Sequence, residues 1–255
     1  MSYIDINCDL GESYGVFKIG NDKEVLKHIS SANIACGYHA GDHNVMMETI
    51  QMAKKYHVNI GAHPGFPDLS GFGRREMNIS TREIYNLTLY QIGALSAFTK
   101  VEGVKLVHVK PHGALYNMAA KSRLIADAIA QAVADYDSGL ILFGLSGSEL
   151  INAGNEKGLV TAQEVFADRT YQPDGTLTSR KDPNSMIHDL KFAAKRIIRM
   201  IREGKVTTTD GTDISINADT VCIHGDEPVA LDFILELKYA LTNEKIAIRK
   251  SWSER

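Results

Sequence analysis

Acidic, imidazole and cationic side chains recur along this chain of 255 residues, usually directly after a short apolar run. The stretch NIACGYHAGDH (33–43) is typical, because it places His39, Asp42 and His43 behind a hydrophobic segment. Such groups can move protons, hold an anion or bind a metal, and catalysis needs several of them within reach of one substrate. Their chemistry therefore depends on which elements position them.

Seven apolar runs alternate with longer stretches of helical periodicity. The predicted strands are residues 3–8, 33–37, 58–62, 106–110, 139–144, 159–164 and 220–225. This alternation predicts an α/β fold with a parallel sheet covered by helices, since several strands are apolar on both faces. The residues alone leave open whether the sheet closes into a barrel or forms an open doubly wound sheet.

One segment interrupts the alternation. Residues 206–216 contain an Asp-Gly pair between alternating side chains, which predicts a small extra β-hairpin outside the main sheet. The chain has no low-complexity linker, and its length suits one barrel of about 250 residues. We therefore expect a single domain over residues 1–255.

Polar residues lie at the ends of six of the seven predicted strands or in the segments directly after them. In chain order they are Asn7, Asp9 and Glu12; His39 and Asp42; His63, Arg74 and Arg75; Lys110, His112 and Asn117; Glu164, Asp168 and Arg169; and His224 and Asp226. In parallel α/β architectures the carboxyl ends of the strands share one face, where ligands bind. Any one histidine could be a hydrogen-bonded structural residue, whereas four at different strand ends indicate a common pocket.

Composition and motifs exclude several functions. The formal net charge is −3 without a block of Lys and Arg, so nucleic-acid binding has no electrostatic support. No apolar stretch is long enough to span a bilayer and no leader peptide is expected, while three sparse cysteines fit a reducing cytoplasm. The phosphate-binding loop G-x-x-x-x-G-K-[ST], the G-x-S-x-G elbow and the H-E-x-x-H helix are absent. The sequence leaves open whether the protein binds a divalent metal, because Asp9, His39 and His63 could supply one carboxylate and two imidazoles as ligands.

Six stretches closely resemble the LamB/YcsF family: DINCDLGE, ANIACGYHAGD, IGAHPGFPDLSGFGRR, VKPHGALYN, EVFADRTY and VCIHGD. The resemblance implies a distorted seven-stranded parallel (β/α) barrel, similar to the glycoside hydrolase and deacetylase superfamily. It also implies a role in the ATP-dependent opening of 5-oxo-L-proline to L-glutamate, together with separate B and C subunits. Those partners are thought to use the ATP, which fits the missing phosphate loop.

Ring opening needs an activated water, a group that stabilises the oxyanion and an acid for the leaving nitrogen. As a hypothesis, Asp9 with His39 or His63 activates water, directly or through a metal. Lys110 faces the oxyanion or a transferred phosphate. Protonation of the ring nitrogen falls to His112 or His224.

The remaining polar residues are expected to bind the substrate. Arg74, Arg75 or Arg169 would hold its carboxylate in a bidentate pair. The other expected pocket residues are Asn7, Glu12, Asp42, Asn117, Glu164, Asp168 and Asp226.

Two other classes of protein compete with this interpretation. One is a stand-alone metal-dependent deacetylase or amidohydrolase that needs no ATP. The other is a non-catalytic subunit whose pocket only captures a ligand or docks partners. The long loops at 64–80 and 168–185 are candidate lids or partner surfaces, and a homo-oligomer is left open.

Overall fold

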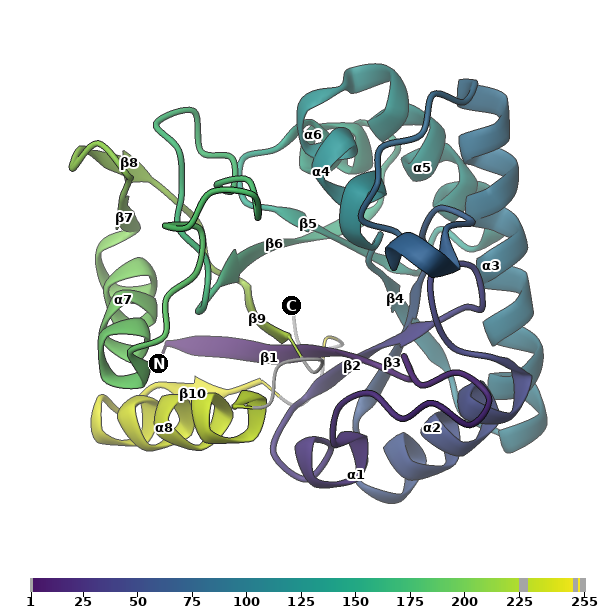
Figure 1. Cartoon of the computed structure of the whole chain (residues 1–255), viewed down its shortest axis with the longest axis horizontal. Coiled ribbons are helices and arrows are strands. Elements are labelled where there is room, and N and C mark those ends of the chain that lie inside the picture. The colour runs from purple at the N-terminus through teal and green to yellow at the C-terminus, as the bar shows by residue number, and fades with distance from the viewer. Residues whose placement is uncertain (1, 225–228, 250–251, 253–255) are drawn as a thin grey trace.

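A closed ring of parallel strands forms the centre of the molecule (Figure 1). The computed structural model describes residues 2–224, 229–249 and 252. The ring consists of β1 (Tyr3–Leu10), β2 (Ser31–Ala35), β3 (Asn59–His63), β4 (Leu106–Val109), β5 (Ile141–Leu145), β6 (Val160–Phe166) and β9 (Thr220–His224). Pairing of β9 with both β6 and β1 closes it. The seven-stranded barrel is therefore confirmed.

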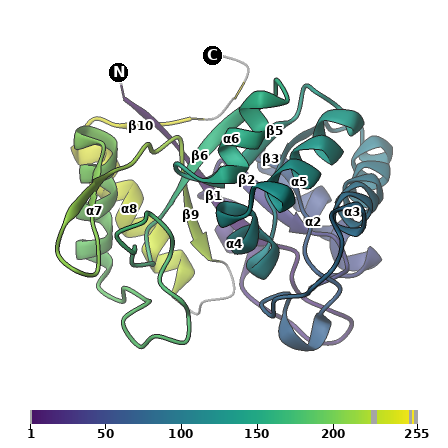
Figure 2. The same cartoon turned by 90° about the horizontal axis from the view of Figure 1, so that it is seen from above.

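Helices surround the ring on its outside (Figure 2). They are α1 (Asp22–Val25), α2 (His43–Lys55), α3 (Thr81–Glu102), α4 (Gly113–Lys121), α5 (Arg123–Tyr136), α6 (Glu149–Glu156), α7 (Leu190–Glu203) and α8 (Ala230–Asn243). A capping box begins α3, where Ser80 accepts from the backbone of Glu83 and Glu83 accepts from that of Ser80. None of the helices in the described part of the chain has the length and apolar character needed to cross a membrane.

Small elements complete the fold. The predicted hairpin is confirmed as β7 (Lys205–Thr207) paired with β8 (Asp213–Ser215). A short strand that the sequence did not predict, β10 (Ala247–Ile248), pairs with the start of β1. The loop after β3 contains one 3-10 turn, η1 (Leu69–Gly71).

Strand ends differ from the predicted ones in a way that matters for the site. β1 continues two residues further than expected, so Asp9 lies inside the strand. His63 and His224 are the last residues of β3 and β9. These side chains are consequently held by the hydrogen-bonded ladder and not by a loop.

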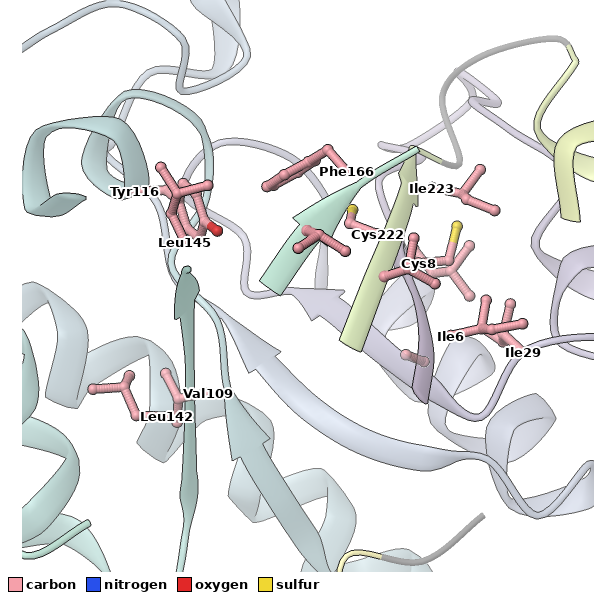
Figure 3. Close-up of a cluster of buried hydrophobic side chains, with 14 of the residues drawn as sticks. Ile6, Cys8, Ile29, Val109, Tyr116, Leu142, Leu145, Phe166, Cys222 and Ile223 are labelled. Atoms are coloured by element: carbon pink, nitrogen blue, oxygen red, sulfur yellow. The ribbon is translucent and has the colours of Figure 1, made fainter. Parts of the chain in front are cut away.

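The two faces of β1 have opposite chemistry. Ile4, Ile6 and Cys8 belong to the apolar cluster, and Figure 3 shows Cys8 near Ile223 of β9 and Ile6 beside Ile29. Asp5 and Asn7 alternate with them, are fully buried, and bond to residues of other strands. The barrel interior is therefore lined by hydrogen-bonded polar groups, while the apolar core includes residues of both strands and helices.

One glycine makes part of this polar interior possible. The Nε2 of His108 on β4 lies 2.7 Å from the Oδ1 of Asn33 on β2, across the intervening strand β3. A Cβ on Gly61 of β3 would lie 2.1 Å from that Nε2. Only glycine leaves room for the contact, so Gly61 is required for the packing of His108.

Candidate active site

A large open cleft lies at the carboxyl ends of the barrel strands. Its volume is about 1490 Å³, and its walls include the loops after β3 and β6. Polar residues from five strands or the segments directly after them contribute to its lining: Asp9, His63, Lys110, His112, Arg169 and His224. The structure thus brings together side chains that are far apart in the sequence.

Asp9 is held as a buried carboxylate between cationic and amide groups. Its Oδ1 accepts hydrogen bonds from Asn33 Nδ2 at 2.8 Å and from Lys110 Nζ at 2.9 Å. Its Oδ2 lies 3.3 Å from His63 Nε2. Burial alone would raise the pKa of Asp9, but His63 and Lys110 outweigh that cost and hold the pKa well below its usual value. Asp9 is therefore ionised at neutral pH.

Lys110 is enclosed by acceptors. Its Nζ lies 2.9 Å from Oδ1 of Asp9 and 2.9 Å from Oε1 of Glu164, and 3.1 Å from the Sγ of Cys222. Burial would lower the pKa of Lys110, but the surrounding groups, with Asp9 first, raise it well above its usual value. Lys110 is a permanent ammonium that lies between two buried acidic side chains and keeps Asp9 charged.

Three histidines gather around Glu12 at the side of Asp9. His39 Nε2 lies 3.3 Å from Glu12 Oε1, and His112 Nδ1 lies 3.7 Å from the same oxygen. His112 Nδ1 is also 2.9 Å from His63 Nε2. Burial, followed by the neighbouring histidines, lowers the pKa of His112 well below its usual value, and burial with His63 does the same for His39. Both rings are neutral at pH 7.

This histidine cluster is the part of the site that could hold a metal. One ligand atom from each of Glu12, His39, His63 and His112 lies within 4.8 Å of the others. The set shares His39 and His63 with the set expected from the sequence but contains Glu12 and His112 in place of Asp9. A second group of three, Asp9, Cys222 and His224, meets the same distance limit.

His224 forms a dyad with Asp168. His224 Nδ1 donates to Asp168 Oδ2 at 2.7 Å, which leaves Nε2 as the reactive nitrogen of the ring. Burial would raise the pKa of Asp168, but His224 outweighs it and the pKa is lowered. The dyad orients an imidazole at the cleft and can pass a proton to or from a ligand.

Several residues that were expected to bind the substrate have structural partners. Asp42 caps α2 by accepting from the backbone of Asn44 and Val45, and its other oxygen accepts from Gly15. The guanidinium of Arg75 pairs with Asp68.

Other expected residues lie at the cleft or inside the barrel. Arg169 is buried and donates to the carbonyls of Thr178 and Ser185, so it ties the loop after β6 together and also reaches the cleft. Arg74 and Asn117 are exposed at the cleft wall. Asn7 donates to Glu164 inside the barrel. Asp226 lies outside the described residues.

Three residues that the sequence did not single out support the site. Asn33 bridges Asp9 and Asn7 through its Nδ2, and the Tyr116 hydroxyl donates to Glu164 Oε2 at 2.7 Å. Cys222 contacts the ammonium of Lys110. Only Asn33 left a signal in the sequence, since an amide inside the otherwise apolar run ANIACG must find a buried partner.

Comparisons with known proteins define first the class of fold. The structure is similar to the catalytic domain of a peptidoglycan N-acetylglucosamine deacetylase from Eubacterium rectale, with a TM-score of 0.54, 9% identity, and coverage of 100% of this chain and 90% of that one. At this identity the likeness concerns the fold alone. The molecule is thus a (β/α) barrel with a charged cleft at the carboxyl ends of its strands.

Closer similarities identify the family. The family model described as LamB/YcsF matches residues 4–254, and the chain belongs to that family. The A subunit of 5-oxoprolinase from Oceanobacillus iheyensis is 62% identical over 97% of this chain and 96% of its own length. The protein of the same name from Bacillus subtilis is 57% identical over 94% of each chain. A lactam utilization protein from Thermus thermophilus has a TM-score of 0.92 at 47% identity, covering 98% of this chain and 100% of its own.

Proposed function

We propose that this chain is the A component of an ATP-dependent 5-oxoprolinase, which opens the lactam of 5-oxo-L-proline to L-glutamate with partner subunits B and C. The names of relatives that are 55–62% identical over nearly the whole chain support this function. The single observation that carries its chemistry is the ionised Asp9, which lies beside His63 at the wall of the cleft.

The cleft contains the groups that amide hydrolysis requires. Asp9, held beside His63, is placed to take a proton from a water that attacks the carbonyl carbon. As the C–N bond breaks, His224 is placed to protonate the ring nitrogen, and the former carbonyl becomes the side-chain carboxylate of glutamate. Lys110 keeps Asp9 in its basic form, so its main contribution is to position and charge the carboxylate.

The wall of the cleft carries more cationic than acidic side chains. The lining includes Arg74, Arg75, Lys110, Lys121, Arg169, Arg180 and Lys181, against Asp9, Glu76, Asp174 and Asp182. The chain as a whole has a formal charge of −3. A local excess of positive charge in an acidic protein favours an anionic ligand, and 5-oxoproline carries a carboxylate.

In this proposal the partner subunits bind and use the ATP. An unstrained five-membered lactam is a poor electrophile, which gives a reason to activate it before water attacks. The sequence has no phosphate-binding loop of the G-x-x-x-x-G-K-[ST] type. ATP is therefore assigned to subunits B and C, and ring opening to this chain.

Reconstitution tests the proposal. This chain is mixed with purified B and C subunits, ATP and 5-oxo-L-proline, and glutamate is measured over time. We expect glutamate only when all three subunits are present, and a rate about 10²- to 10⁴-fold lower with His63→Gln. The matched control is His43→Gln, which changes an exposed histidine at the first position of α2.

Two results would overturn the assignment. One is glutamate formation by B and C without this chain. The other is an unchanged rate with a folded His63→Gln variant. Lactam or acetamide hydrolysis by the isolated chain without ATP would instead favour a stand-alone amidohydrolase.

A further inference from the structure

Two backbone carbonyls fix the orientation of His63 and His112. His63 Nδ1 donates to the carbonyl oxygen of Lys110 at 2.7 Å, and His112 Nε2 donates to that of Phe72 at 2.8 Å. A carbonyl only accepts, so each of these nitrogens carries a proton, and in the neutral form of each ring it is the only ring proton. The other two nitrogens, His63 Nε2 and His112 Nδ1, then present lone pairs to each other across 2.9 Å. Such an arrangement requires a positive charge at this point.

The same arrangement is the usual surrounding of histidines that bind a metal. A ligating histidine almost always donates its second N–H to a backbone carbonyl or carboxylate, which fixes the ring and its tautomer. Around a tetrahedral zinc ion, bonds of about 2.1 Å place the ligand atoms about 3.4 Å apart. Here His63 and His112 are separated by 2.9 Å, and His112 and Glu12 Oε1 by 3.7 Å.

We propose that Glu12 Oε1, His63 Nε2 and His112 Nδ1 form a three-ligand site for a divalent cation of the zinc class. Two imidazoles and one carboxylate are a common ligand set for a catalytic zinc site with an open position. His63 and His112 line the cleft, so the site faces the space where a substrate would enter. A cation there would act as a Lewis acid beside Asp9.

His39 is a positioning residue in this proposal and not a fourth ligand. Its ring is stacked on His112 with a centroid distance of 3.7 Å and an angle of 4° between the planes. The lone pairs of two stacked rings lie in separate parallel planes, so they cannot both be directed at one ion. His39 Nδ1 is buried without a hydrogen-bond partner, and an orphaned N–H costs more than an orphaned lone pair would. The proton therefore sits on Nε2, which donates to Glu12.

The competing explanation is a shared proton. His63 Nε2 could carry it between His112 Nδ1 at 2.9 Å and Asp9 Oδ2 at 3.3 Å. That arrangement satisfies the same lone pairs without a metal. The shared-proton explanation predicts that the chain binds no stoichiometric metal ion, so a measurement of bound metal distinguishes the two explanations.

Metal binding by the isolated full-length chain tests the proposal. The chain is stripped with a chelator and titrated with Zn²⁺ by calorimetry, bound metal is counted after desalting, and Co²⁺ is used as a spectroscopic substitute. We expect one ion per chain and an absorption spectrum of four- or five-coordinate Co²⁺. With His112→Gln or Glu12→Gln the affinity should fall by more than about 100-fold, beyond the range for an outer-shell partner.

The stacked pair offers a matched control. Like His112→Gln, the variant His39→Gln removes the ring stack, but it keeps an N–H that can reach Glu12. Its affinity for Zn²⁺ should therefore fall by no more than about tenfold. His224→Gln should keep the full affinity, because it belongs to the other group of candidate ligands. Thermal unfolding with and without Zn²⁺ checks that each variant folds.

Three results would overturn the proposal. They are no stoichiometric uptake by the unaltered chain, unchanged affinity in a folded His112→Gln or Glu12→Gln variant, and equal losses in His39→Gln and His112→Gln. No substrate or partner takes part in these measurements. A negative result in the metal titration would therefore overturn the metal site without contradicting the proposed lactam chemistry, which the reconstitution assay tests separately.

Discussion

Two aspartates of the same strand, Asp5 and Asp9, show how the two ends of the barrel differ. Both are buried, with exposed fractions of 0% and 6%. Asp5 accepts hydrogen bonds from the hydroxyls of Ser30, Ser31 and Thr220, where β2 and β9 begin. Asp9 lies at the opposite end of β1 and faces Lys110 and His63.

The partners decide the charge of each carboxylate. Burial raises the pKa of Asp5 to about 6, because the hydroxyls only partly offset the cost of desolvation. At Asp9 the interactions with His63 and Lys110 outweigh the same cost and lower the pKa. Equal burial thus yields a structural carboxyl group at the amino end and a permanently charged one at the carboxyl end. The difference separates the stabilising end of this barrel from its reactive end.

The largest effect on stability is expected from Lys110→Met. It would leave Asp9 and Glu164 buried without their shared cation, and breaking a buried ion pair in this way costs about 3–5 kcal/mol. Urea unfolding at pH 7 measures the change. Lys121→Met, which removes an exposed lysine at the end of α4, is the matched control and should stay within about 0.5 kcal/mol. A loss below about 1 kcal/mol for Lys110→Met would contradict the pairing.

A smaller effect concerns the pH dependence of Asp5. Its folded pKa of about 6 lies above the ordinary value of 3.8. The native state therefore holds this proton longer than the unfolded chain, and stability falls as pH rises through the window between these values. In Asp5→Asn this loss disappears. The variant should gain about 2 kcal/mol relative to the unaltered chain between pH 4 and pH 7. Urea unfolding at both pH values tests this, and a pH-independent difference would refute it.

The smallest expected effect is that of Ser31→Ala. The hydroxyl donates to Asp5 Oδ1 at 2.7 Å, and one hydrogen bond contributes about 1 kcal/mol. The loss in the free energy of unfolding should be larger at pH 7, where Asp5 is mostly ionised, than at pH 4. The comparison uses the same unfolding curves. An equal loss at both pH values would mean that Ser31 does not respond to the charge of Asp5.

Much of the fold could be predicted because its signals are local. Apolar runs, helical periodicity and the Ser80–Glu83 capping box each lie within a few residues, and each of the seven predicted strands and the hairpin overlaps an observed one. Closure of the barrel could not be derived this way, since it depends on β1 pairing with β9 more than 200 residues away. Asn117, expected after the fourth strand, lies in the separate helix α4, which Ser122 divides from α5.

The sequence predicts which segments meet at the site, but it does not predict which side chains pair with each other there. Parallel strands carry their carboxyl ends to one face, so Asp9, Lys110 and His224 could be expected to meet. Which polar group faces which depends on register. Asp42 therefore turned out to cap α2, and Arg75 to pair with Asp68. His108, which is not among the expected site residues, is buried beside Asn33, and burial first, then Lys110, lowers its pKa to about 3.

The most direct test compares Asp9→Asn with Asp5→Asn in the coupled assay with partner subunits, ATP and 5-oxo-L-proline. We predict that Asp9→Asn lowers glutamate formation by about 10²- to 10⁴-fold, while Asp5→Asn stays within about threefold of the unaltered chain. Thermal unfolding confirms that both variants are folded. Equal rates for the two folded variants would contradict the assignment of the chemistry to the carboxyl end of the barrel.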